Sequence, residues 1–320
     1  MLIIHVLPEN ADVCGGIKVH YQLAQLEKSL GHSPVIAYPL VEEEPRWFSH
    51  SCKVLSWKDA FLMAKAHEDE CVVIGRESPS EILPWPAKYK VCYVQGESLM
   101  AGSPSDFKDL TMWYSSKWNL SQCTSRGYRE GPLVYPFVDP RVFHPGVGEK
   151  FRRQHLSVLV QLRKNGKLRW LEMTQHLKKD LLAGLNPVFL SGVSEKEFAQ
   201  HLRQADILFA HSFPEGFGLP SLEALYSGTL VVGYTGGGGT DFLVDHVNCF
   251  LAPDNQPAFA AHSFLEVISM NPIVLDTIVQ RGLVAAGGYS AYATRLMLSE
   301  ALRYTMQHYP PSEDVWDAVL

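Results

Sequence analysis

Two glutamates in one short stretch could act on a ligand that carries both phosphate and hydroxyl groups. Glu215 and Glu223 are separated by seven residues, and Gly216 and Gly218 lie between them. Glycines let the backbone bend and come close to a ligand because they have no Cβ. Pro220 suits the start of a helix, where the free backbone N–H groups of the first turn attract an anion. Carboxylates beside an anion site predict a ligand such as a nucleotide sugar.

The segment that holds these residues resembles a known enzyme family. Glu215 and Glu223 match the Glu-x7-Glu signature of the retaining glycosyltransferases of family four, the group 1 type, and the wording Glu-Gly-Phe-Gly-Leu-Pro-Ser-Leu-Glu-Ala-Leu is close to the usual motif. The resemblance implies the GT-B fold, in which two Rossmann-like domains with doubly wound parallel sheets face each other across a cleft. The alternative is a glycine turn that caps an ordinary helix and carries two solvated glutamates.

The resemblance also implies roles for individual residues of the motif. Glu215 would face the donor sugar and steady the positive charge that develops at the anomeric carbon. Glu223 would accept hydrogen bonds from the ribose hydroxyls. Four further residues would bind the donor through their backbone beside the phosphate or the sugar: Gly216, Phe217, Gly218 and Leu219.

A basic turn lies upstream of the motif, after an expected strand over residues 157–161. Fixed cations lower the barrier when negative charge grows on a leaving diphosphate. In the family, an arginine and a lysine at this point hold the diphosphate, and Arg163 matches that pattern. The lysine spacing departs by one, so either Lys164 or Lys167 fills the second role; we favour Lys167 as the catalytic partner and place Lys164 among the donor-binding residues. The alternative is a solvated basic loop.

Two glycine-rich turns are further candidates for donor binding. Gly15 and Gly16 follow the first expected strand, where the family's first-domain loop approaches the diphosphate. Gly237, Gly238 and Thr240 follow a later strand, where the family places a loop beside the sugar. The residues after these glycines depart from the family wording, which leaves the sugar preference open. The alternatives are a plain strand–helix turn and a mobile loop.

The sequence indicates fewer residues for binding the acceptor than for binding the donor. Gln95 and Glu97 end a first-domain strand and are candidates for acceptor binding, although they could equally be structural residues at a strand end. Many family members have a histidine near this point, and none stands here. A retaining front-face mechanism passes the acceptor proton to the leaving phosphate, so a base is not required. The chain has no Asp-x-Asp motif, and we expect neither a metal nor another cofactor.

Strands and helices alternate along both halves of the chain, which favours an α/β fold with parallel sheets. Helix 194–204 is expected to begin with a capping box formed by Ser194 and Glu197. Three prolines in residues 134–145 mark a boundary. We expect an acceptor-side domain over 1–138, a nucleotide-sugar-binding domain over 139–300 and a helical tail over 301–320, for which packing on the first domain is one option. The expected strands are 2–7, 33–38, 71–75, 91–95, 111–115, 157–161, 187–191, 207–210, 230–234 and 249–252, and the other expected helices are 19–30, 58–67 and 116–125.

Composition sets outer limits on function. The chain has 320 residues, 19% of them charged, and a net charge of −6, which gives no general attraction to nucleic acid. The six cysteines are scattered without a Cys-x2-Cys pair, as expected for reduced thiols of a cytoplasmic protein rather than a zinc site. No apolar run reaches membrane length. Peripheral membrane contact stays open because many sugar acceptors are lipid-linked.

The sequence therefore predicts a retaining, metal-independent glycosyltransferase that moves a sugar from a nucleoside-diphosphate sugar to a glycan, a lipid-linked or a small-molecule acceptor. One alternative is a nucleotide-sugar epimerase of the same fold. Another is a non-catalytic module that binds nucleotide sugars. A dehydrogenase is disfavoured because no Gly-x-Gly-x-x-Gly follows the first strand.

Overall fold

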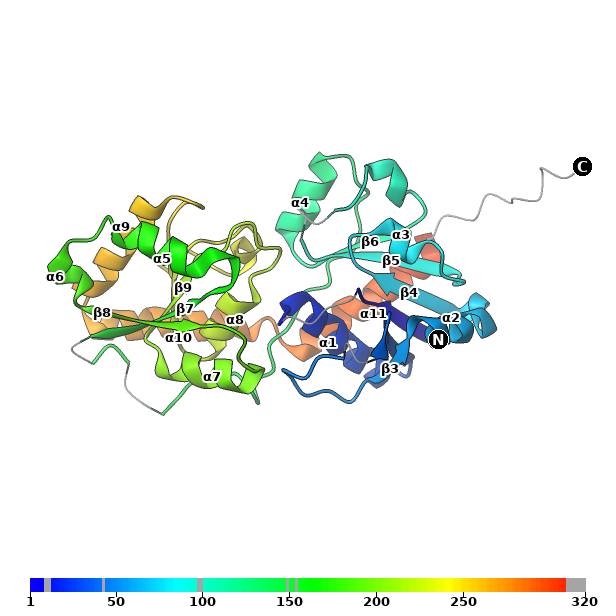
Figure 1. The fold of residues 1–320 in the computed structure, drawn as a ribbon, viewed down its shortest axis with the longest axis horizontal. Coiled ribbons are helices and arrows are strands. Elements are labelled where there is room, and N and C mark those ends of the chain that lie inside the picture. The colour runs from blue at the N-terminus through cyan, green and yellow to red at the C-terminus, as the bar shows by residue number, and fades with distance from the viewer. Residues whose placement is uncertain (9–12, 42–43, 97–99, 148–149, 153–154, 309–320) are drawn as a thin grey trace, which may run out of the picture.

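The computed structural model describes residues 1–8, 13–41, 44–96, 100–147, 150–152 and 155–308. These residues form two α/β domains that lie end to end, and the first is at the right of Figure 1. Each domain has one parallel sheet. The strands are apolar and largely buried, as expected when helices cover both faces of a sheet. The predicted pair of doubly wound domains is confirmed.

The first sheet has six strands in the order β3-β2-β1-β4-β5-β6. Its central strand, β1, is buried along its whole length and pairs with β2 and β4. The strands are β1 (Leu2–Val6), β2 (Ser33–Tyr38), β3 (Lys53–Ser56), β4 (Cys71–Gly75), β5 (Tyr89–Val94) and β6 (Thr111–Tyr114). Strand β3 was not among the expected strands, because this edge strand is short and only partly buried and so lacks a clear apolar pattern.

The second sheet has five strands in the order β11-β10-β9-β7-β8. Its strands are β7 (Leu156–Gln161), β8 (Leu185–Leu190), β9 (Ile207–Ala210), β10 (Leu230–Gly233) and β11 (Phe250–Leu251). All of them agree with the expected strands to within two residues at each end. The core of this sheet includes Trp170, Phe209 and Phe264, whose rings pack in edge-to-face pairs.

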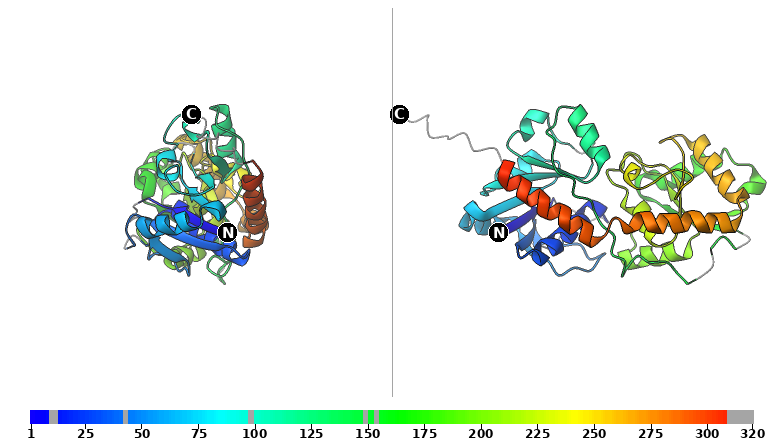
Figure 2. Two further views of the ribbon diagram at one scale, coloured as in Figure 1. Left: turned by 90° about the vertical axis from the view of Figure 1, so that its right-hand side faces the viewer. Right: turned by 180° about the vertical axis from the view of Figure 1, so that it is seen from behind.

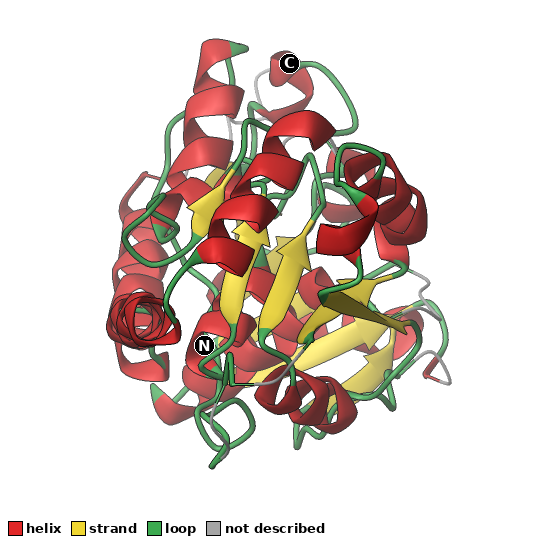
Figure 3. Cartoon of the chain, turned by 90° about the vertical axis from the view of Figure 1, so that its left-hand side faces the viewer, coloured by secondary structure: helices red, strands yellow, loops and turns green. Residues whose placement is uncertain are grey.

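Helices lie on both sides of the strands of the second domain, which faces the viewer in Figure 3. Helix α7 begins with the predicted capping box, in which the Ser194 hydroxyl accepts from the Glu197 amide and the Glu197 carboxylate accepts from the Ser194 amide. Helix α1 starts four residues earlier than expected, directly at Gly15. The helices are α1 (Gly15–Ser29), α2 (Trp57–Ala66), α3 (Pro79–Ile82), α4 (Lys117–Ser125), α5 (Gly166–Thr174), α6 (Lys179–Leu182), α7 (Glu195–Gln204), α8 (Leu219–Tyr226), α9 (Pro257–Ser269), α10 (Pro272–Gly287) and α11 (Ala291–His308).

The chain passes between the domains twice. Residues 134–145 make the first passage, and the junction between α10 and α11 makes the second. Helix α10 packs against α8 of the second domain, whereas α11 packs against α1, β5 and β6 of the first. The indole nitrogen of Trp113 on β6 donates to Thr305 on α11 at 3.0 Å. Figure 2 shows the two helices running one after the other along the back of both domains. The division expected at residue 300 thus falls within one continuous helix, and residues 309–320 lie outside the described part.

Across the described residues, no single helix has both the length and the apolar composition to cross a bilayer. One bent pair, α9 with the stretch Pro272–His308, meets these two criteria together.

Candidate active site

A cavity of about 610 Å³ lies between the two domains, at the carboxyl ends of strands from both sheets. Ligands bind at this edge in open parallel sheets. The cavity brings together most of the residues that the sequence nominated: Gly15, Gly16, Gln95, Arg163, Lys164, Glu215, Gly216, Phe217, Gly218, Leu219 and Glu223. Lys167, Gly237, Gly238 and Thr240 are not among its lining residues, and Glu97 lies outside the described residues.

The Glu215 turn connects β9 to α8 and is fixed from both sides. The Glu215 amide donates to Gly236 at 2.7 Å, and the Glu215 carbonyl accepts from Gly238 at 2.9 Å. Gly218 has a φ of 91°, which favours glycine, and it caps α8, so the bend predicted at this point is confirmed. Pro220 lies in the first turn of α8. The turn therefore holds the Glu215 carboxylate and the start of α8 at the same cavity.

Gly216 lies in close contact with the first domain. A Cβ at this position would lie 1.6 Å from the carbonyl oxygen of Gln95. The Gly216 carbonyl accepts from the Ser116 hydroxyl at 2.6 Å and from the Asn119 amide at 3.0 Å, both at the start of α4. The absence of a side chain thus serves contact with the first domain as well as the bend.

The basic turn delivers Lys164, not Lys167, to Glu215. The Lys164 ammonium lies 2.7 Å from Glu215 Oε2 and donates to the Pro214 carbonyl at 3.0 Å. Lys164 has a φ of 50° and belongs to the short 3-10 helix η5 (Arg163–Asn165), which turns the chain sharply after β7. Arg163 lines the same cavity, and its guanidinium has no hydrogen bond or ion pair with any described residue.

Three buried charges join the domains at another part of the cavity wall. Lys18 on α1 lies 2.7 Å from Glu223 on α8 and 2.6 Å from Glu195 on α7. Burial alone would lower the pKa of Lys18, but the two carboxylates outweigh it and raise that pKa. Burial, together with the charge of Glu195, raises the pKa of Glu223 against the pull of Lys18. The carboxylate nominated for ribose is therefore engaged by a lysine of the other domain.

The glycine-rich loop after β10 lies behind the Glu215 turn. A Cβ on Gly237 would meet the ring of Trp118 on α4 at 2.4 Å, and one on Gly238 would meet the Gly216 carbonyl at 2.1 Å. The Thr240 hydroxyl donates to Gly237 at 2.7 Å. These glycines permit dense packing between the loop, the turn and the first domain. Contact between this loop and a donor stays a prediction.

Three residues at the cavity were not nominated from the sequence: Lys18, Glu195 and Arg76. Lys18 follows the Gly15–Gly16 pair in the first turn of α1, and this nearness to a nominated glycine turn could have indicated that it lies at the cavity. Glu195 and Arg76 line the cavity from the start of α7 and from the end of β4. Their positions depend on how two distant segments meet, and no local pattern in the sequence indicates this.

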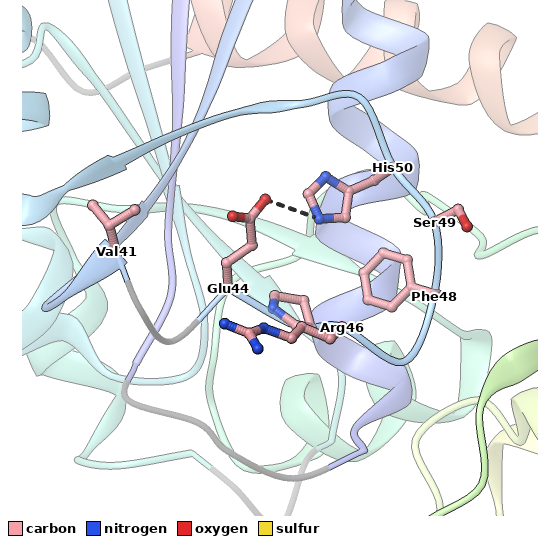
Figure 4. Close-up of a pocket in the computed structure, with 7 residues that line it drawn as sticks. Val41, Glu44, Arg46, Phe48, Ser49 and His50 are labelled. Carbon is pink, nitrogen blue, oxygen red and sulfur yellow. Dashed lines mark ion pairs between the residues drawn. The ribbon is translucent and has the colours of Figure 1, made fainter.

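A second cavity, of about 390 Å³, lies within the loop between β2 and β3. Figure 4 shows Glu44 and His50 pointing toward each other across it, at 3.2 Å. The same loop reaches the second domain, because the Trp47 carbonyl accepts from the Glu195 amide at 2.9 Å. None of the nominated residues lines this cavity.

Comparison with known proteins agrees with this geometry. Residues 161–279 match the family model of the glycosyl transferases group 1. Sucrose-phosphate synthase from Thermosynechococcus elongatus superposes with a TM-score of 0.73 at 12% identity over 96% of this chain and 99% of that one. HepE from Anabaena, in complex with UDP and glucose, gives a TM-score of 0.72 at 12% identity over 95% and 99%.

A glycosyltransferase from Rickettsia africae gives a TM-score of 0.69 at 15% identity over 96% of this chain and 98% of that one. No curated protein sequence matches the chain significantly. The structural matches establish a fold shared over nearly the whole chain, and the family match covers the domain that carries Arg163, Glu215 and Glu223. The chain therefore has the GT-B fold, and residues 161–279 of its second domain match the glycosyl transferases group 1.

Proposed function

We propose that the protein transfers a sugar from a nucleoside-diphosphate sugar to an acceptor, with retention at the anomeric carbon and without a metal. The observation that carries the proposal is the cavity between the domains, in which Glu215, its ion-pair partner Lys164 and the uncommitted Arg163 lie together. Structures of the same fold hold UDP and glucose, and UDP-glucose, in HepE. We extend the nucleotide-sugar class of donor to this chain on that basis.

Each group at the cavity has a role in this reaction. Arg163 and Lys164 bind the diphosphate and stabilise the negative charge that grows on it as the glycosidic bond breaks. Their fixed charge takes the place of a metal. Glu215 stabilises the positive charge that develops at the anomeric carbon. The start of α8 lines the same cavity through Leu219 and Pro220, and the N-terminus of this helix adds partial positive charge.

Retention follows if the acceptor hydroxyl attacks from the face that the diphosphate leaves. The acceptor proton then passes to the departing phosphate oxygen, and the chain needs no base of its own. We place the acceptor site on the first domain, at Gln95, because this side chain lines the cavity. Its amide nitrogen donates to the Gly16 carbonyl at 3.0 Å, which fixes its orientation. A cytoplasmic location, with an acceptor that is a glycan, a lipid-linked sugar or a small molecule, belongs to the same proposal.

Ribose binding by Glu223 requires a change in its contacts. Lys18 holds the Glu223 carboxylate at 2.7 Å, so the ribose hydroxyls must share the carboxylate or displace the ammonium. Glu195 offers Lys18 a second partner at 2.6 Å, which keeps the ammonium paired after such a displacement. Donor binding and the contact between the domains are therefore linked through Lys18.

A thermal-shift screen of nucleoside diphosphates and their sugars tests the donor class, since a ligand that binds the folded state raises its melting temperature. We expect selective stabilisation by one diphosphate, and a smaller shift in Arg163→Gln than in the control Arg281→Gln on α10. NMR of the product anomer then tests retention. An inverted product, or full turnover in EDTA-treated protein only after a divalent metal is restored, would refute that part of the proposal.

A further inference from the structure

Arg76 lies on the wall that the first domain contributes to the cavity. It directly follows β4, next to the strand end that carries Gln95, and its side chain is 19% exposed. Arginine side chains are rarely this buried without a partner for their charge. The contacts of the guanidinium therefore indicate what it is positioned to bind.

Within the described residues, only the Nε of the Arg76 guanidinium has a charged partner. Its Nε lies 3.4 Å from one carboxylate oxygen of Glu77 and has no hydrogen bond. The other Glu77 oxygen accepts from the amides of Gln95 and Gly96 at 2.6 and 2.9 Å. The terminal nitrogens of Arg76 have no hydrogen bond or ion pair with any described residue. Glu77 thus orients the side chain, and the outer donors are left for a ligand.

A comparison of the cavity cations separates Arg76 from most of the others. Five cationic side chains line the cavity among the described residues, and four are in ion pairs with carboxylates: Lys18, Arg76, Lys164 and Arg169, of which Arg76 is paired only through its Nε. The terminal donors of Arg163 and Arg76 are uncommitted, and these two residues come from opposite domains. Arg163 is the residue that the proposed reaction assigns to the donor diphosphate. Arg76 is the other cation with uncommitted terminal donors, and it belongs to the first domain.

We propose that Arg76 binds an anionic group of the acceptor, a phosphate or a carboxylate. This inference rests on the proposed function, because it defines the acceptor of that reaction. The terminal nitrogens of arginine form a planar fork that matches either anion with two parallel hydrogen bonds. The Arg76 side chain is mostly buried, and the lower dielectric around a buried group strengthens such bonds relative to water.

The direct test uses inorganic phosphate as the probe, titrated by calorimetry into the full chain saturated with UDP, or with whichever nucleoside diphosphate binds most tightly. The nucleotide occupies the Arg163 side and leaves the Arg76 side open. We expect phosphate to bind to this complex, about tenfold or more weaker binding in Arg76→Gln, intermediate binding in Arg76→Lys, which keeps the charge but not the planar fork, and near-normal binding in the control Arg281→Gln. Circular dichroism and melting temperature establish that each variant is folded.

Three results would overturn the proposal: no phosphate binding to the wild type, equal binding by Arg76→Gln, or binding that the nucleotide abolishes, which would assign Arg76 to the donor. If no nucleotide stabilises the protein, the donor class fails separately, and phosphate binding without nucleotide still tests Arg76. A second arm compares glucose, glucose 6-phosphate and glucuronate as acceptors. Wherever transfer occurs, we expect an anionic acceptor to be preferred about tenfold, and Arg76→Gln to remove that preference. A comparison of the transfer rates to glucose 6-phosphate and to glucuronate shows whether Arg76 prefers a phosphate or a carboxylate.

Discussion

The two walls of the cavity are built in different ways. The second domain supplies its wall mainly from three segments that follow strands: the η5 turn with Arg163 and Lys164, residues 190–198, and the turn with Glu215. The first domain supplies one run of residues at the start of α1 and otherwise one or two residues from each of several separate places: the loop between β2 and β3, the ends of β4 and β5, and the start of α4. A wall made from contiguous residues leaves a motif in the sequence, whereas a wall assembled from distant residues does not.

Glu215 tests the contiguous wall most strongly. We expect Glu215→Ala to lower kcat by about 10³-fold, the order found when one group that stabilises a transition state is removed. Melting temperature should stay near the wild-type value because Glu215 is partly exposed. The measurement is initial transfer rate at saturating donor, with Glu172→Ala on α5 as the control. Unchanged turnover in Glu215→Ala would show that Glu215 does not stabilise the transition state.

Lys18 tests the seam between the two walls. Lys18→Met leaves Glu195 and Glu223 close together without a cation, and breaking a buried pair in this way costs about 3 kcal/mol. Because the pair joins the domains, we expect the loss to appear as domain separation, seen as a larger radius of gyration in solution scattering, together with a lower melting temperature. Lys28→Met, at an exposed position of the same helix, is the control. A compact and equally stable Lys18→Met protein would show that the charges do not hold the domains.

Gly216 tests how closely the walls must approach. Gly216→Ala places a Cβ where the Gln95 carbonyl lies, so the turn and the end of β5 must move apart. A displacement on the order of 1 Å costs about 100-fold in kcat/KM. We expect this loss with little change in nucleotide affinity, measured by kinetics and calorimetry beside Gly287→Ala, a position with no atom near the added Cβ. Equal activity of the two variants would contradict the close approach.

Buried histidines give the smallest and most gradual test. Burial lowers the pKa of His20, on α1, well below its usual value, with His5 and Arg76 adding to the effect, and burial also lowers the pKa of His211 after β9. The unfolded chain therefore binds protons near pH 6.5 that the folded chain does not bind, and stability falls with pH below that value. The slope is at most about 1.4 kcal/mol per pH unit for each group.

Hydrogen exchange measured between pH 7.5 and 5 would localise this effect. We expect the loss of protection to be larger in the first domain, because His20 is fully buried beside His5 whereas His211 Nε2 donates to the Gln161 carbonyl at 2.8 Å. If the second domain lost its protection at a higher pH than the first domain, the larger effect would belong to His211 and not to His20. His211→Gln should flatten the pH response of the second domain alone.

The sequence was sufficient for most strands of the two sheets and for the Glu215 turn of the second-domain wall, because strand burial and the Glu215 motif are local patterns. It was insufficient at the edge strand β3, whose few residues are only partly buried. It also favoured Lys167 over Lys164, because family spacing says nothing about the positive φ of Lys164 that turns the side chain toward Glu215. Arg76 and Glu195 acquire their surroundings only when separate segments meet, so no window of sequence could nominate them.

The double passage of the chain between the domains has a mechanical consequence. A single linker would let the two halves swing and twist in any direction. Here the segment 134–145 and the α10–α11 junction both tie the halves together, so large movements that keep the chain intact are limited to a hinge rotation about the line through the two ties. Opening for product release then separates Lys18 from Glu223 and Ser116 from Gly216 in one concerted movement, without any change in the sheets.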